Sequence, residues 1–154
     1  MLKYDSYNIV LQEIPNEISL CFTITGCQLA CDGCHSEHIW NPENGKELTS
    51  DFFEKLILKY QKTITCILFM GGEWSCDDLV LLISIAQEKD LKTALYTGLN
   101  EKQLKRKHPE LLQNLDYLKT GKWIPNLGGL DNRNTNQILR NLKSGEIMNL
   151  YFIH

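Results

Sequence analysis

The sequence has no apolar run that approaches the ~20 residues needed to cross a membrane. Its first six residues, Met1-Leu2-Lys3-Tyr4-Asp5-Ser6, lack the apolar core of a signal peptide. No internal repeat, low-complexity segment or linker divides the 154 residues. These absences favour one domain, residues 1–154, in the cytoplasm and without a membrane partner.

An excess of basic residues is also lacking, since the formal net charge is −3 at pH 7. Without a general positive field, nucleic acid is not an expected partner. Six cysteines without a secretory signal indicate a reducing compartment, where thiols bind metal or stay free. The apolar fraction of 43% and charged fraction of 23% are those of an ordinary globular protein with a core.

Half of the cysteines gather in one short stretch, at Cys27, Cys31 and Cys34. This spacing suits three thiolates that converge on one metal centre from a single loop. Three thiolates on a four-iron cluster leave one iron without a protein ligand, and a substrate can bind at such an open position. The alternative is a zinc site, with His35, His38 or Cys21 as the fourth ligand.

Short apolar runs alternate along the chain with stretches of helical periodicity. We expect strands over residues 7–15, 17–25, 63–70, 92–96 and 116–119. We expect helices after Thr49 or Ser50, after Ser75, through the charged stretch beyond Gly98, and from Pro109. Such alternation predicts an α/β fold with a parallel sheet and right-handed crossovers. Because a full eight-stranded barrel needs ~250 residues, we expect an open, partial β/α barrel.

The remaining segments are predicted to be less regular. Residues 35–46 and 122–134 contain prolines and glycines and are expected to be loops, the second facing a partner. Asn134 or Thr135 is expected to cap a short helix that ends before Gly145. Residues 147–153 fit a last strand or a docked tail. Among the other cysteines, Cys21 and Cys66 are expected in the core, and Cys76 is expected to be inert.

Each polar or glycine-rich motif follows directly after a predicted strand. These motifs are the thiols, Gly71-Gly72-Glu73, Thr97-Gly98 and Lys119-Thr120-Gly121. Because parallel strands end at the same edge of a sheet, we expect the motifs to converge on one pocket. Glycines allow a backbone to approach a ligand closely, and a glutamate accepts hydrogen bonds from an ammonium group.

The motif Cys27-x-x-x-Cys31-x-x-Cys34, followed by Gly71-Gly72-Glu73, resembles the radical S-adenosylmethionine superfamily. Within it, the short chain, Cys34-His35 and Thr135-Asn136-Gln137 resemble the activating proteins of anaerobic ribonucleotide reductase, which are activases of glycyl radical enzymes. The runs 66–74 and 95–98 are similar to a small subgroup of these activases. The resemblance covers most of the chain.

The resemblance implies a mechanism. Cys27, Cys31 and Cys34 would hold a [4Fe–4S] cluster, whose open iron is chelated by the amino and carboxylate groups of S-adenosylmethionine. Gly71 and Gly72 would approach the methionine part of this cofactor. Reductive cleavage of the sulfonium would give a 5′-deoxyadenosyl radical, which removes a hydrogen atom from a glycine of the reductase. The implied partners are the anaerobic ribonucleotide reductase and an electron donor such as flavodoxin or ferredoxin.

The other cofactor contacts follow from the same resemblance. Glu73 would lie near the ammonium of S-adenosylmethionine, and Thr97 and Lys119 would contact its ribose or carboxylate. Gly33 stands where many superfamily members have an aromatic residue beside the adenine, so backbone near His35 or a side chain from elsewhere is expected there. Thr120 stands where related activases often have an acidic residue.

Two other functions remain open from the sequence alone. One is a small radical S-adenosylmethionine enzyme that acts on a small molecule, although a chain of this length leaves little to enclose a second substrate. The other is a zinc-binding interaction module that uses the three cysteines and a histidine. Iron with sulfide, rather than zinc, in the anaerobically purified protein would separate the zinc module from both enzymes.

Overall fold

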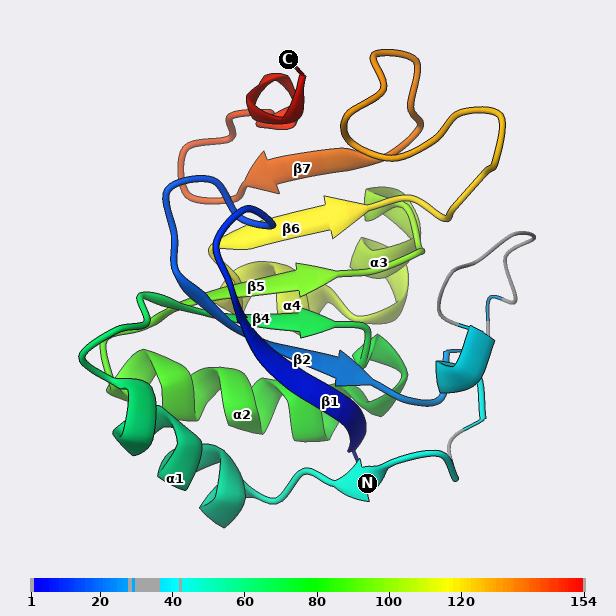
Figure 1. The fold of residues 1–154 in the computed structure, drawn as a ribbon. Helices are drawn as coiled ribbons and strands as arrows, with labels where there is room; N and C mark the ends of the chain where they lie inside the picture. The colour runs from blue at the N-terminus through cyan, green and yellow to red at the C-terminus, as the bar shows by residue number, and fades with distance from the viewer. Residues whose placement is uncertain (1, 28, 30–36, 42, 154) are drawn as a thin grey trace.

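A computed structural model describes residues 2–27, 29, 37–41 and 43–153 of the chain. Its strands form one seven-stranded sheet in the order β3-β1-β2-β4-β5-β6-β7 (Figure 1). The fold is therefore α/β, as predicted, with helices between the central strands. Cys31, Cys34 and His35 lie outside the described residues.

The sheet begins with an antiparallel pair. β1 (Lys3–Val10) pairs with β2 (Ser19–Ile24), and Asn16 in the connection has a φ of 68°. Two strands joined by a turn were predicted here and are confirmed, but the first begins and ends earlier than the predicted 7–15 and the second is shorter than 17–25. The loop expected over residues 35–46 is wrong in two places, because a 3-10 turn spans Glu37–Ile39 and β3 (Lys46–Glu47) pairs with the outer edge of β1.

The centre of the sheet is parallel. β2 pairs with β4 (Cys66–Met70), β4 with β5 (Lys92–Tyr96), and β5 with β6 (Tyr117–Thr120). The parallel sheet predicted from the alternation of elements is confirmed for these four strands. Their carboxyl ends consequently open at one edge of the sheet (Figure 1).

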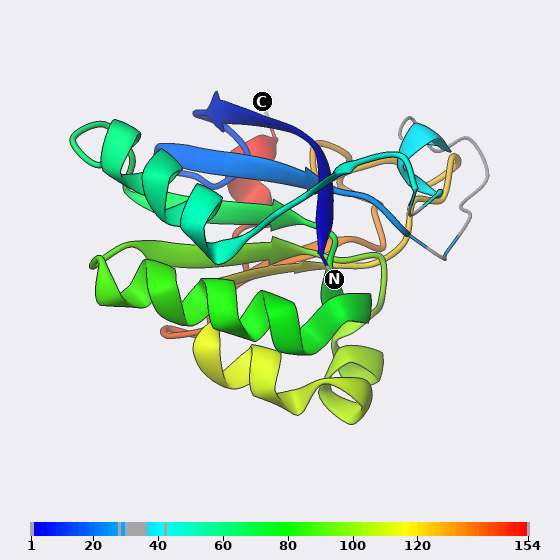
Figure 2. The same ribbon diagram turned by 90° about the horizontal axis from the view of Figure 1, so that it is seen from below.

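Four helices connect the parallel strands: α1 (Ser50–Tyr60), α2 (Cys76–Glu88), α3 (Glu101–Lys107) and α4 (Pro109–Asn114). They gather on one side of the sheet (Figure 2). The predicted cap of α1 is confirmed, since Thr49 Oγ1 accepts a hydrogen bond from Phe52 N at 3.1 Å. No helix in the described part of the chain is both long and apolar enough to cross a membrane.

Alternating residues of the strands divide the core between the two faces of the sheet. The helix side buries large apolar side chains such as Phe22, Phe69 and Leu95, together with Phe53 from α1 and Ile83 from α2. Burial of each such side chain contributes about 1.5–3 kcal/mol. The buried residues of α1 and α2 therefore face the sheet.

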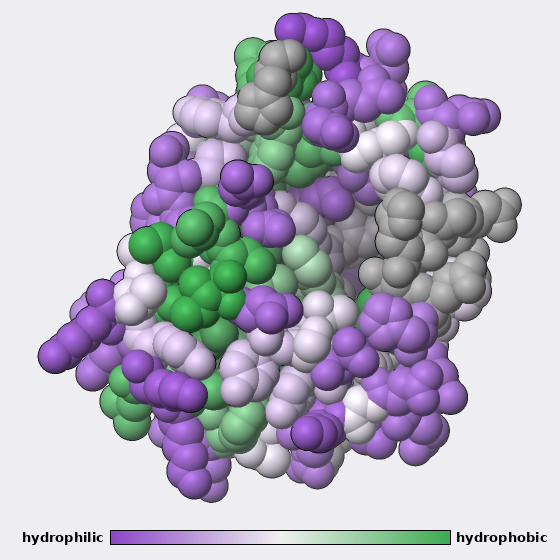
Figure 3. Space-filling model, in the orientation of Figure 1, coloured by the Kyte–Doolittle hydropathy of each residue, from purple (hydrophilic) through white to green (hydrophobic). Residues whose placement is uncertain are grey.

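Connections rather than helices cover the opposite face. Ile14 from the β1–β2 connection, Leu130 from the segment after β6, and Met148 pack against Cys21 and Cys66. The two cysteines are core residues, as predicted. Figure 3 shows apolar surface gathered on this side of the molecule.

The C-terminal part differs from the prediction. The expected helix after Thr135 is wrong, because Ile138–Asn141 forms β7, antiparallel to β6. As a strand, this segment can hydrogen-bond to the edge of β6 that is not paired with β5. The tail then docks, since the Asn149 side chain accepts from Leu139 N and donates to Gln137 O. The tail contains a 3-10 turn, Asn149–Phe152, and no named strand.

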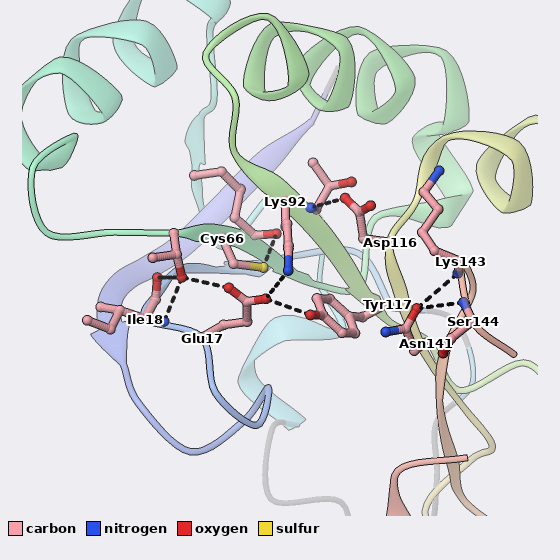
Figure 4. A network of polar contacts seen from close by, with 12 residues as sticks. Glu17, Ile18, Cys66, Lys92, Asp116, Tyr117, Asn141, Lys143 and Ser144 are labelled. Carbon is pink, nitrogen blue, oxygen red and sulfur yellow. Dashed lines mark hydrogen bonds and ion pairs between the residues drawn. The ribbon is translucent and has the colours of Figure 1, made fainter. Parts of the chain in front are cut away.

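A buried carboxylate fixes the β1–β2 connection at the amino end of the parallel strands (Figure 4). Glu17 accepts hydrogen bonds from Thr65 Oγ1 at 2.8 Å and from Tyr117 OH at 2.5 Å, and pairs with Lys92 Nζ at 3.1 Å. Burial and then Glu17 raise the pKa of Tyr117 to about 12, so its hydroxyl remains a donor. This network joins β4, β5 and β6 to the segment that precedes β2.

Replacing Tyr117 by Phe should lower the free energy of unfolding by about 1–2 kcal/mol, because Glu17 loses a buried hydrogen bond to its charged carboxylate. Chemical denaturation would measure the change. Tyr151→Phe is the matched control: Tyr151 is half exposed and should change stability by less than about 0.5 kcal/mol. Equal effects in the two variants would show that the network contributes nothing.

Candidate functional site

One row of side chains crosses the parallel strands at the edge where they end. In register, Met70 of β4 pairs with Tyr96 of β5, and Tyr96 pairs with Lys119 of β6. All three line one pocket of about 200 Å³. Because paired residues of neighbouring strands project to the same face, the register itself forms the floor of this pocket.

Five of the predicted site residues line this pocket: Cys27, Gly71, Glu73, Thr97 and Lys119. They come from four segments that are far apart in the sequence, so the expected convergence of strand ends is observed. Gly72 does not line the pocket. The pocket is completed by Leu29, Ile39, Trp74, Gly98, Gly121, Trp123 and Gln137.

The two glycines after β4 both have a positive φ, of 90° at Gly71 and 111° at Gly72. A Cβ atom on Gly71 would lie 2.6 Å from Cη2 of Trp74. One on Gly72 would contact Leu2 and Ile24 from the helix-side core. Gly71 thus leaves the pocket wall without a side chain at this point. Gly72, through its positive φ, directs the chain into the 3-10 segment Glu73–Ser75.

Glu73 is a buried carboxylate with one oxygen in use. Its Oε1 accepts a hydrogen bond from Thr97 Oγ1 at 2.8 Å, while Oε2 is buried with no hydrogen-bond partner among the described residues. Desolvation raises the pKa of this carboxyl group, and the hydrogen bond from Thr97 opposes that shift. A donor that enters the pocket would satisfy Oε2 and favour the charged carboxylate.

Lys119 supplies the opposite charge. Its Nζ lies 4.6 Å from the ring centroid of Tyr96, and no carboxylate in the described part of the chain forms an ion pair with it. Burial lowers the pKa of this ammonium group to about 8. The pocket therefore offers one acceptor and one cation, which suits a zwitterionic ligand.

Hydrogen bonds hold both ends of the cysteine segment beside the pocket. Gly26 N donates to Ile39 O at 2.6 Å, which brings together the residues before and after this segment. Trp74 Nε1 donates to Thr25 O at 3.2 Å. Trp74 follows Glu73 directly, so the strand end that carries the carboxylate is joined to the beginning of the segment that carries Cys27.

Several pocket residues were missed or misjudged from the sequence. Tyr96 is one, although its place as the last residue of a predicted strand is the signal that could have found it. Trp74 and Gln137 also line the pocket, and neither was predicted as a site residue. Gln137 is buried and donates from Nε2 to Gly121 O at 3.3 Å. This contact depends on the antiparallel return of β7, which sequence periodicity did not reveal.

The remaining thiols and His38 are placed elsewhere. Burial raises the pKa of Cys21 and of Cys66 to about 12, so both thiols stay protonated. Burial, followed by a hydrogen bond to Glu110, raises the pKa of Cys76 to about 12, which agrees with the unreactive thiol predicted. His38 lies 3.3 Å from Asp5 on β1 and is not among the residues that line the pocket.

Comparisons with known proteins show what this chain is similar to. The family described as "4Fe-4S single cluster domain" matches residues 18–149. A pyruvate formate-lyase-activating enzyme of Clostridium pasteurianum is 30% identical over 79 residues, 47% of this chain and 33% of that protein. No solved structure matches the chain significantly.

A second relative aligns over a longer region. The anaerobic ribonucleoside-triphosphate reductase-activating protein of Enterobacteria phage T4 is 28% identical over 113 residues. That region is 68% of this chain and 70% of the phage protein, whereas the chain spans only a third of the clostridial relative. Together the matches confirm the resemblance to activases of glycyl radical enzymes that the sequence indicates.

The position of Lys119 predicts an unusual titration. Its ammonium group should lose its proton near pH 8, whereas the unfolded chain holds that proton to about pH 10.5. Since the unfolded state then binds more protons, stability should rise with pH between these two values. Side-chain NMR of the lysines would identify the resonance that titrates near pH 8. Lys119→Met should remove both this resonance and the increase of stability with pH. A titration of Lys119 above pH 10 would contradict the prediction.

Proposed function

Because the chain belongs to the family of 4Fe–4S single cluster domains, we propose that it is a radical S-adenosylmethionine activase that generates a glycyl radical on an anaerobic ribonucleotide reductase. In this proposal residues 1–154 form one radical S-adenosylmethionine domain, an open partial β/α barrel, in the cytoplasm. The observation that carries the proposal is the buried Oε2 of Glu73, which has no hydrogen-bond partner among the described residues and lies in one pocket with Cys27 and Lys119.

Cys27, Cys31 and Cys34 are the proposed ligands of the [4Fe–4S] cluster. Thiolates are the ligands that such clusters require, and three of them leave one iron open. Cys27, the described member of the set, borders the pocket. A cluster held by these thiolates would supply an open coordination position, and Glu73 and Lys119 line the same pocket as Cys27 to hold the bound cofactor.

The methionine part of S-adenosylmethionine matches the two charges of the pocket. Its ammonium group would donate to Glu73 Oε2, and its carboxylate would pair with Lys119. Thr97 Oγ1 donates to Glu73 Oε1 and so orients the carboxylate toward the pocket. Charge-assisted hydrogen bonds of this kind are typically worth about 1.5–3 kcal/mol each.

The other predicted contacts support the same placement. Gly71 presents backbone without a side chain at the pocket wall, while Gly72 shapes the turn behind it. Thr97, which lines the pocket, is the proposed ribose contact, and backbone near His35 is the proposed adenine contact. When bound and reduced, the cluster would supply the electron that cleaves the sulfonium into methionine and a 5′-deoxyadenosyl radical.

A reactive radical must be protected from water, and the described residues of the chain line the pocket without closing it. Trp74, Tyr96 and Leu29 give it apolar walls. We propose that docking of the reductase supplies the missing cover, with residues 123–133 as the contacting rim, because Trp123 from this segment already lines the pocket. An electron donor such as flavodoxin or ferredoxin would reduce the cluster.

Glu73→Gln should weaken S-adenosylmethionine binding roughly ten- to a hundredfold, because the amide keeps the size of the side chain but loses the charge that pairs with the ammonium. Equilibrium binding to the anaerobically reconstituted protein would measure it. The iron and sulfide content should stay unchanged. Glu54→Gln, an exposed substitution on α1, is the control. An unchanged dissociation constant would remove Glu73 from the cofactor site.

The function is tested by reducing the protein anaerobically with S-adenosylmethionine and its host's anaerobic ribonucleotide reductase. Electron paramagnetic resonance should show a glycyl radical on the reductase, with 5′-deoxyadenosine formed in proportion. Cys31→Ala should abolish both products, and Cys66→Ala, a core substitution, should retain them if the protein folds. Cofactor cleavage without a radical on a competent reductase would replace the activase by an enzyme that acts on a small molecule.

A further inference from the structure

A second group of metal-binding side chains lies on the helix side of the sheet, apart from the three clustered cysteines. Cys76 begins α2, His108 joins α3 to α4, and Glu110 lies in the first turn of α4. One ligand atom from each lies within 4.8 Å of those from the other two. Three different donor types, sulfur, nitrogen and oxygen, thus meet at one point.

The backbone holds this arrangement in place without a ligand. His108 N donates to Leu104 O at 2.7 Å to close α3, and Leu111 N donates to His108 O at 3.1 Å to open α4. Leu104 and Leu111 are fully buried, so the junction between the two helices is anchored in the core. Pro109 at the start of α4 further limits the conformations of the junction.

The existing contact within the group is a hydrogen bond from Cys76 Sγ to Glu110 Oε1 at 2.8 Å. That bond explains why Cys76 and Glu110 lie close together. It does not involve His108, the third member of the group. Zinc bonds of about 2.0–2.3 Å in tetrahedral geometry place neighbouring ligand atoms roughly 3.3–3.8 Å apart. The observed upper limit of 4.8 Å therefore requires only small side-chain movements.

We propose that Cys76, His108 and Glu110 bind one divalent transition-metal ion, zinc by preference, at a site separate from the proposed iron–sulfur cluster. Calcium and magnesium prefer oxygen ligands, whereas a thiolate, an imidazole and a carboxylate together suit zinc. Three protein ligands leave the fourth position to water. His108 also lines a solvent-connected pocket of about 440 Å³, from which an ion and its water can enter.

Binding requires the thiol to give up its proton, which the metal displaces. In return the ion would join the beginning of α2 to the α3–α4 junction. Glu73 lies three residues before Cys76 and also borders the pocket that His108 lines. The metal would therefore stabilise the segment that carries the buried carboxylate, without contacting the proposed cofactor itself.

The test uses the cluster-reconstituted protein, incubated anaerobically with Zn²⁺ and freed of unbound ion. Elemental analysis should find one zinc per chain, with iron and sulfide unchanged. Cys76→Ser should lose the zinc and keep the iron. Glu110→Gln, which keeps the side-chain size, should raise the zinc dissociation constant at least tenfold, a loss no smaller than that for an outer-shell partner. Glu88→Gln, exposed at the end of α2, should bind zinc normally.

A second measurement removes any contribution from the cluster cysteines. The chain with Cys27, Cys31 and Cys34 all replaced by Ala is titrated with Co²⁺, and a thiolate-to-cobalt absorption band should appear at one equivalent. His108→Gln in this background should weaken binding, with circular dichroism confirming that each variant is folded. Failure to retain zinc, or a cobalt band that persists after Cys76→Ser, would overturn the proposal and leave only the thiol–carboxylate hydrogen bond. These readouts do not depend on activase activity.

Discussion

Parallel pairing of β2, β4, β5 and β6 is the constraint on which the rest of this structure depends. It aligns Met70, Tyr96 and Lys119 in one row and places the turns that follow each strand at a single edge. Helices cover one face of the sheet, and connections pack on the other. The pocket is therefore a product of strand register, and its residues are far apart in the sequence.

Glu73 shows what this arrangement costs the folded state. One oxygen of this carboxylate has no donor among the residues that the structure describes. An unsatisfied buried acceptor destabilises a folded protein, because it has lost its hydrogen bonds to water. The buried ammonium of Lys119 adds a similar penalty on the other side of the pocket. Both penalties are relieved by a ligand that carries the two complementary charges, so stability and binding are linked at this site.

The sequence was sufficient for the parallel core because its strands are continuous apolar runs between recognisable helix caps. Thr49 and Pro109 mark helix starts by local chemistry alone. β7 was mistaken for a helix, since Ile138, Leu139 and Leu142 fit helical spacing and five residues cannot distinguish the two periods. Residues 138–141 form a strand because they hydrogen-bond to the free edge of β6, which is distant in the sequence. For the same reason Glu73 and Thr97 were predicted separately, while their hydrogen bond required the fold.

The backbone hydrogen bond from Gly26 to Ile39 holds the proposed cluster segment in place independently of the cluster. It fixes both ends of residues 27–38, so the entropy of closing this loop is lost when the chain folds rather than when metal arrives. An oxygen-damaged cluster could then leave and be replaced while the sheet stays intact. The sheet would therefore hold the two ends of this segment together whether or not a cluster is bound.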